Sequence, residues 1–93
     1  MDVKIINEVW VFNGTNAQFP SGVFSSREGA EEWIQKHRLT GTLTKYPVDM
    51  SVYDWAIENG LFKLKDEENK SANFIQRFSS AKQEHYHYED GEK

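Results

Sequence analysis

Hydrophobic and polar residues form strand-like patterns near both ends of the chain. Near the beginning, Val9-Trp10-Val11-Phe12 places β-branched and aromatic side chains on both faces of a strand, which favours a central strand predicted over Val3 to Asn13. Near the end, the segment from Gln83 to Tyr88 alternates strictly between two sets of side chains. The predicted strand has Gln83, His85 and His87 on one face and Glu84, Tyr86 and Tyr88 on the other.

Two shorter segments also favour strands. Turn-forming residues follow the first strand, so Gly22 to Phe24 is expected to return as a short antiparallel partner. The segment from Thr42 to Tyr46 is rich in β-branched and aromatic residues, and Pro47 ends it because proline cannot donate a ladder hydrogen bond.

A first helix is predicted after the short strand. Ser25-Ser26-Arg27-Glu28 fits a capping box that begins at Ser25, with Ser26 as the alternative cap. Apolar or aromatic-ring side chains then recur at helical spacing, and the helix is expected to end near Arg38. The members of this stripe are Ala30, Trp33, Ile34 and His37.

A second helix is predicted from the cap Ser51 to Asn59. Gly60 is the expected left-handed residue after the helix, with Leu61 as its hydrophobic partner. Because Trp33 and Trp55 lie on the apolar stripes of the two helices, both are expected to be largely buried. Truncation of either to alanine is then expected to cost about 3–5 kcal/mol.

The remaining segments have weaker patterns. Residues 63–73 are highly charged and lack an apolar period, so they are expected to form a solvated loop. Phe74, Ile75 and Phe78 favour a short helix, although a strand remains open. The C-terminal residues 90–93 are expected to fray. Together these elements predict one α+β domain over residues 1–93, with a small, mainly antiparallel sheet of three to five strands and two helices packed on it.

The composition of the chain limits the cellular compartments and the classes of partner that are expected. The 93 residues include 11 Lys or Arg, 15 Asp or Glu and no cysteine, giving a net charge of -4. This charge disfavours nucleic acid, and the lack of cysteine excludes disulfides. The sequence has neither an apolar run of about 18 residues nor a signal-peptide pattern, so a cytoplasmic protein without membrane partners is expected. The protein is expected to be either a monomer or a small homo-oligomer.

The histidine pair is the strongest candidate for chemistry. His85 and His87 project to one side of a strand and could both ligate a metal, but such a site needs more ligands, for which His37, Glu89 and Asp90 are candidates. Exposed strand histidines are the commoner explanation, so no metal site is assigned. No nucleophile motif or phosphate-binding glycine loop is present, and neither catalytic residues nor cofactors are predicted.

Several strings of residues together resemble a bacterial family of small uncharacterised proteins, each a domain of unknown function. They are Val-Trp-Val-Phe-Asn-Gly at 9–14, Phe-Pro-Ser-Gly-Val-Phe-Ser-Ser-Arg-Glu at 19–28, Tyr-Pro-Val-Asp at 46–49, Tyr-Asp-Trp-Ala-Ile-Glu-Asn-Gly at 53–60, and Gln-Glu-His-Tyr-His-Tyr-Glu-Asp-Gly at 83–91. The segment from Gly22 to Glu31 also resembles a strand-to-helix element of small bacterial α+β domains, some of them suspected immunity or interaction modules. The family resemblance implies no reaction, cofactor or catalytic residue.

Three hypotheses about function remain open. The first is a non-catalytic protein-interaction module, including the immunity-like type, because the sequence specifies a fold but no catalytic constellation. Its expected partner surface comprises Gln83, His85, His87, Glu89 and Asp90. The second is a small enzyme or metal-binding protein that uses the face of His85 and His87, and the third is a small-ligand sensor.

Overall fold

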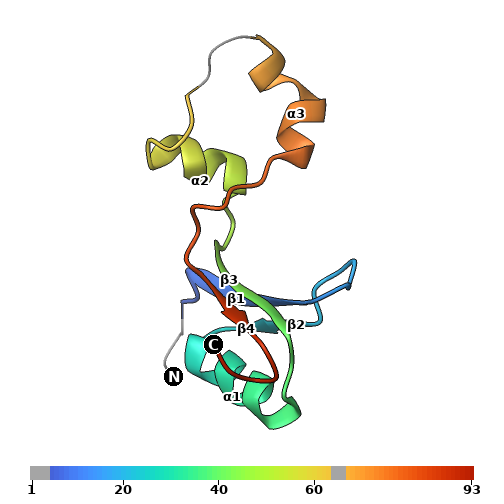
Figure 1. Ribbon diagram of the computed structural model, residues 1–93. Helices are drawn as coiled ribbons and strands as arrows, with labels where there is room; N and C mark the ends of the chain where they lie inside the picture. The colour runs from blue at the N-terminus through green and yellow to red at the C-terminus, as the bar shows by residue number, and fades with distance from the viewer. Residues whose placement is uncertain (1–4, 64–66) are drawn as a thin grey trace. The chain divides into compact units, whose positions relative to one another are not determined.

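The structure, a computed structural model, describes residues 5–63 and 67–93 (Figure 1). Backbone contacts divide these residues into two compact units. The first unit holds the described residues up to Val48 together with Gln83–Lys93, and the second holds those within Asp49–Lys82. The organisation of the chain as one domain stays a prediction.

The first unit is built on a four-stranded antiparallel sheet in the order β2-β1-β3-β4 (Figure 1). Its strands are β1 (Glu8–Gly14), β2 (Gly22–Phe24), β3 (Gly41–Pro47) and β4 (His85–Tyr88). This confirms the predicted α+β fold, including the central position of β1. Among the described residues, β1 begins at Glu8 rather than at the predicted Val3, which itself lies outside the described part.

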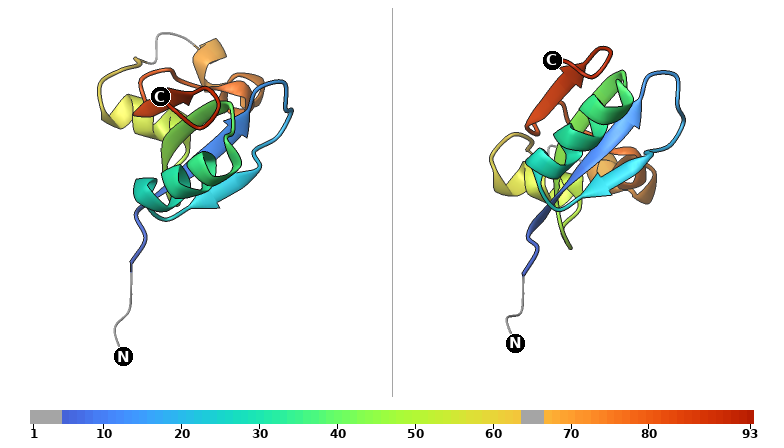
Figure 2. Two further views of the ribbon diagram at one scale, coloured as in Figure 1. Left: turned by 60° about the horizontal axis from the view of Figure 1, so that its bottom comes forward. Right: turned by 90° about the horizontal axis from the view of Figure 1, so that it is seen from below.

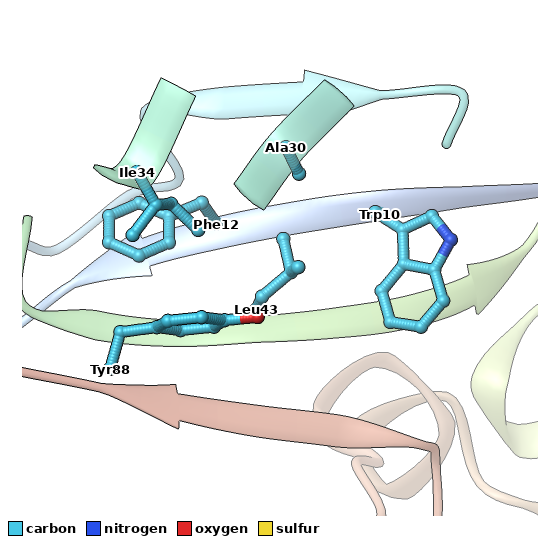
Figure 3. Close-up of a cluster of buried hydrophobic side chains, with 6 residues drawn as sticks. All are labelled: Trp10, Phe12, Ala30, Ile34, Leu43 and Tyr88. Carbon is cyan, nitrogen blue, oxygen red and sulfur yellow. The ribbon is translucent and has the colours of Figure 1, made fainter. Parts of the chain in front are cut away.

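Helix α1 (Arg27–His37) covers one face of this sheet (Figure 2). Its N-cap is Ser26, the alternative in the sequence analysis, whose hydroxyl accepts a hydrogen bond from the amide of Gly29 at 3.1 Å. Ala30 and Ile34 point from α1 toward Phe12 and other core side chains of the sheet, as Figure 3 shows. The buried core consists of Trp10, Phe12, Ala30, Ile34, Leu43 and Tyr88.

The C-terminal residues do not fray as predicted but form an ordered turn. Asp90 and Gly91 both have positive φ, 50° and 87°, and Glu89 and Glu92 exchange two backbone hydrogen bonds across them at 2.7 and 3.0 Å. This is the conformation of a two-residue hairpin of the type that Asp-Gly favours. The turn is also anchored to the end of α1, because the amide of Gly91 donates to the carbonyl of Leu39 at 2.8 Å.

The substitution Gly91→Ala is expected to loosen this turn by about 2 kcal/mol, since alanine is strained at positive φ and its Cβ would lie 3.1 Å from the Cα of Arg38. Gly60→Ala is the matched control, because Gly60 also has positive φ, 69°, but no atom lies within 4 Å of the added Cβ. It should cost about 1 kcal/mol. Amide hydrogen exchange, which reports local stability in each unit, checks both values, and equal losses would contradict the close approach of Gly91 to α1.

The second unit contains α2 (Val52–Glu58), the 3₁₀ helix η1 (Glu67–Lys70) and α3 (Ala72–Arg77). Helix α2 begins at its predicted cap Ser51 and ends in the predicted motif, because the amide of Leu61 donates to the carbonyl of Ala56 at 2.9 Å and Gly60 has positive φ. Helix α3 confirms the short helix favoured by the sequence. The ring of Tyr53 contacts the three phenylalanine rings at 62, 74 and 78, with centroid distances of 5.5–6.3 Å.

One further prediction needs correction and one needs refinement. The segment 63–73 is not a continuous loop, because η1 and the start of α3 lie within it and Asn69 accepts a hydrogen bond from the Tyr53 hydroxyl at 2.8 Å; its residues 64–66 lie outside the described part. Most of each side chain of Trp33 and Trp55 is buried, as predicted, but neither is fully enclosed in the core. In α1 the smaller Ala30 and Ile34 occupy the centre of the buried stripe, and Trp33 packs at its margin against Phe12 and Phe24.

Candidate functional site: the free edge of strand β4

Strand β4 is an outer strand of the sheet, and its hydrogen-bonding pattern shows which backbone groups are free. The amide of Lys45 in β3 donates to the carbonyl of Glu84 at 3.0 Å. Because the direction of backbone groups alternates along an antiparallel strand, the residues at 84, 86 and 88 face β3, whereas those at 85 and 87 face away from it. The backbone groups of Glu89 point in the same direction as those of His85 and His87, away from β3. The hydrogen bonds between Glu89 and Glu92 agree with this, because they lie on the side of β4 that faces away from β3.

The backbone amides and carbonyls of His85 and His87 therefore form a short free edge. In the part of the chain that the structure describes, no backbone hydrogen bond joins either residue to a strand beyond β4. The strand carries no proline or lysine, the residues that commonly block such edges. The hairpin of Glu89 and Glu92 closes the edge at one end, so an added strand would be limited to about the length of β4.

The side chains of His85 and His87 lie on the sheet face opposite α1. Tyr86 and Tyr88 pack toward the core that α1 covers, and neighbouring strand residues point to opposite faces. Both histidines are exposed, and their rings meet edge to face with centroids 5.2 Å apart. This confirms that the two histidines share an outward face, as the alternating sequence predicts.

Hydrogen bonds orient both imidazole rings. The Nδ1 atom of His85 lies 2.8 Å from the carbonyl oxygen of Gln83. A carbonyl can only accept, so Nδ1 carries the proton, and in the neutral ring the lone pair is on Nε2. The Nδ1 atom of His87 lies 3.3 Å from the hydroxyl oxygen of Thr42, on the neighbouring strand β3. Each ring is thus oriented by a contact at its Nδ1 atom, and its Nε2 atom lies on the opposite side of the ring from Cβ.

Of the other three residues of the predicted partner surface, two are exposed and one is buried. Glu89 and Asp90 are exposed in the C-terminal turn, at one end of the free edge. Gln83 is buried, with only 4% of its surface exposed, so the prediction that it faces outward with the histidines is wrong. The physical reason is that β4 begins at His85, and the alternation of a regular strand does not extend back to Gln83.

A network of polar side chains joins β4 to α1 on the opposite face. The Tyr88 hydroxyl donates to Glu31 at 2.5 Å, and Glu31 also forms ion pairs of 3.5 Å with Arg27 and Lys93. The distance of 3.5 Å between Nε of Arg27 and the Glu31 carboxylate is too long for a directed hydrogen bond, and this buried Nε has no hydrogen-bond partner among the described residues. Tyr86 donates to Glu84 and lies under the guanidinium of Arg27, 3.8 Å from the ring centroid.

The network fixes the charges of its members. The hydrogen bond from Tyr88 holds the pKa of Glu31 below its usual range, against the opposing effect of partial burial. Burial and the contact with Glu31 raise the pKa of Tyr88, and the hydrogen bond to Glu84 raises the pKa of Tyr86. Both phenols therefore stay neutral near neutral pH and act as hydrogen-bond donors. This arrangement holds β4 against α1 rather than preparing a tyrosine for proton transfer.

The substitution Tyr88→Phe is expected to lower the free energy of unfolding at pH 7 by about 2 kcal/mol, because it removes a hydrogen bond to a carboxylate. The pKa of Glu31 is depressed in the folded state, so its contribution is present above the pKa of the unfolded chain, about 4.3, and is lost as pH falls through the folded value. The difference between the two proteins should therefore shrink by pH 2–3, and urea unfolding at both pH values checks this. A difference that stays constant with pH would contradict the link between Tyr88 and the charge of Glu31.

The C-terminal turn also borders two surface hollows. One has a volume of about 390 Å³ and lies between α1 and the turn, and the other, of about 640 Å³, lies between the turn and His87. The two hollows share Arg38, Tyr88, Asp90, Glu92 and Lys93. The sequence places Glu89 and Asp90 on the predicted partner surface but does not predict the hollows or the turn, although Asp90-Gly91 is a strong hairpin motif.

Neither a metal cluster nor a transmembrane helix occurs in the described residues. No group of three or more His, Asp or Glu side chains within residues 5–63 and 67–93 is placed to hold a metal ion. Within the same ranges, every helix is too short or too polar to span a bilayer.

Comparisons with known proteins place the chain in a family but not with any characterised protein. A search of curated proteins and a search of solved structures find no match. The family described as "Domain of unknown function (DUF7710)" matches residues 9–93, from β1 through the C-terminal turn. The chain therefore belongs to this family, which confirms the predicted membership of an uncharacterised domain family.

Proposed function

We propose that this protein is a non-catalytic protein-interaction module that binds its partner by accepting a strand at the free edge of β4. The observation that carries the proposal is the outward direction of the backbone groups of His85 and His87, both of which are exposed. Strand addition at such an edge gives affinity through main-chain hydrogen bonds, and side-chain pockets beside it give specificity. The proposal includes a cytoplasmic location and an immunity-like role, both of which were predicted from the sequence.

The side chains around the edge support selective binding. His85 and His87 offer ring nitrogens on one face, and Glu89 and Asp90 offer carboxylates at the end of the strand. These groups favour a partner whose strand carries polar or basic side chains, because charge-assisted hydrogen bonds are stronger than neutral ones. The hydrogen bond between Tyr88 and Glu31 joins β4 to α1 and so keeps the strand in place when a partner binds to its free edge.

A proline at residue 87 tests the proposal. The amide of His87 faces away from β3, so His87→Pro removes a donor from the free edge while leaving the ladder between β3 and β4 intact. His87→Thr is the matched control, because it removes the imidazole but keeps the amide and a strand-favouring side chain. Each purified protein is used as bait in a lysate of its source organism, in the presence of a chelator.

Capture of a partner is expected to fall at least ten-fold for His87→Pro relative to His87→Thr. Protection of the Tyr86 and Tyr88 amides against hydrogen exchange, measured in both variants, shows that β4 remains paired with β3. If the proline variant keeps β4 and retains the partner as well as the threonine variant does, strand addition at this edge is wrong.

A further inference from the structure

We infer that the strand accepted at this edge is β4 of a second copy of the chain, and that His85 and His87 of the two copies together bind one divalent transition-metal ion such as zinc. This inference rests on the proposed function, since it names the occupant that the same edge accepts when the metal is present. It adds a metal site that neither copy can form alone. Within the described residues, a single chain brings no third ligand to the two histidines.

The length of the free edge favours a second β4 as the occupant. The edge ends where Glu89 pairs with Glu92, so it accommodates a strand of about four residues, the length of β4 itself. In an antiparallel pair centred on Tyr86, His85 of each copy lies opposite His87 of the other. This register uses every free backbone group of β4 and leaves the occupied groups of Glu89 undisturbed. The resulting contact is symmetric, as in most homodimers.

The same register gathers four imidazoles on one face of the joined sheet. Outward residues opposite each other in such a pair have Cα atoms about 5.5 Å apart, and His85 and His87 are separated along the strand by about 7 Å. Imidazoles at these spacings can converge on a common ion, with Zn–N bonds of about 2.0–2.1 Å. Imidazole ligands suit zinc, copper and nickel.

The contacts at Nδ1 of both rings match a pattern that is common among metal-ligating histidines. A ligating imidazole usually donates its second N–H to a carbonyl, a carboxylate or water, which fixes the ring and increases the basicity of the ligating nitrogen. His85 already has this arrangement, because its Nδ1 donates to the carbonyl of Gln83 at 2.8 Å. Thr42 offers the corresponding oxygen to His87 at 3.3 Å. Both rings therefore present Nε2 as the ligating atom.

The test uses untagged protein, because a polyhistidine tag would bind the added metal. Sedimentation velocity measures the association state with zinc chloride and with a chelator, and metal analysis of the separated dimer gives the stoichiometry. We expect zinc to convert monomer into dimer with one ion per two chains, and the chelator to reverse the change. Amide exchange at His85 and His87 should slow at least ten-fold in the dimer, because both amides become hydrogen-bonded across the new pair.

Histidine substitutions identify the ligands. The double substitution His85→Ala, His87→Ala is expected to abolish both zinc binding and zinc-dependent dimerisation. His37→Ala is the matched control, because His37 is exposed on α1 and lies outside the proposed site, and it should leave both unchanged. A shift of the ¹⁵N resonance of Nε2, rather than Nδ1, is expected for His85 on zinc addition.

Other outcomes overturn the inference without deciding the proposed function. No binding tighter than micromolar, one ion per chain in a monomer, or a zinc dimer without amide protection at His85 and His87 would each contradict the shared site. The capture experiment with His87→Pro and His87→Thr is done in chelator, which releases a zinc-held second copy and leaves the edge open to the strand of another partner. A partner lost only from the proline variant would therefore support strand addition even if the metal site is wrong.

Discussion

Phe12→Ala is expected to lower the free energy of unfolding by about 3–5 kcal/mol. Phe12 is only 2% exposed; it belongs to the same buried cluster as the helix residue Ile34 and meets the Trp33 ring edge to face, with the ring centroids 5.6 Å apart. Its removal forfeits the transfer free energy of a phenyl ring and leaves a cavity in the centre of the core. For a chain of this length the total stability is about 5–14 kcal/mol, so the loss is a large share of it.

Urea unfolding of the purified variant measures this loss. Val23→Ala is the matched control, because Val23 is an apolar strand residue of the same sheet but is 64% exposed, and its truncation should change stability by less than about 0.5 kcal/mol. If the two substitutions have similar effects, the core is not centred on Phe12.

Gly41→Ala is expected to destabilise the sheet by about 3 kcal/mol through overpacking. Gly41 pairs with Gly14 across β3 and β1, and a Cβ at Gly41 would lie 2.2 Å from the carbonyl oxygen of Asn13 and 2.7 Å from the ring of Phe12. The carbonyl belongs to the neighbouring strand, so the backbone of the sheet would have to move to make room.

Gly14 provides the control from the same pair. A Cβ there would meet its nearest atom at 3.8 Å, which is an ordinary contact, so Gly14→Ala should change stability by less than about 0.5 kcal/mol. Thermal and urea unfolding of both variants check the difference. A Gly41→Ala protein as stable as the Gly14→Ala protein would mean that β1 and β3 are not as closely packed at this pair.

Local patterns were sufficient to predict most of the elements. The run from Val9 to Phe12 predicts β1 because its side chains are apolar on both faces, and Ser51 with Gly60 predicts the two ends of α2 because caps depend on neighbouring residues. Ser26 rather than Ser25 caps α1, a displacement of one residue that the capping pattern left open.

The errors fall where distant residues decide the structure. The turn at Asp90 and Gly91 is ordered by hydrogen bonds to Leu39 and Thr40, just after α1 and at least 50 positions earlier in the chain, and the expectation of fraying considered only its place in the sequence. The ring cluster around Tyr53 joins segments on both sides of residues 64–66, and the charged sequence between them concealed it.

The candidate site was predicted only in part for the same reason. Alternation alone places His85 and His87 on one face, and the structure confirms this. Their position at a free edge depends on the strand order β2-β1-β3-β4, which no local pattern contains. The proton position on His85 likewise depends on the carbonyl of Gln83, whose burial the sequence did not predict.

The pairing of β3 with β4 also has a consequence for the order of folding. The amide of Lys45 and the carbonyl of Glu84 are hydrogen-bonded neighbours, yet the whole of Asp49–Lys82 lies between them in the chain. Closing this loop, about four times longer than the one between Phe12 and Gly22, costs about 1.2 kcal/mol more in chain entropy. β1, β2 and β3 are therefore expected to assemble first, with β4 docking in a later step, after compaction of the second unit has shortened the loop that must be closed.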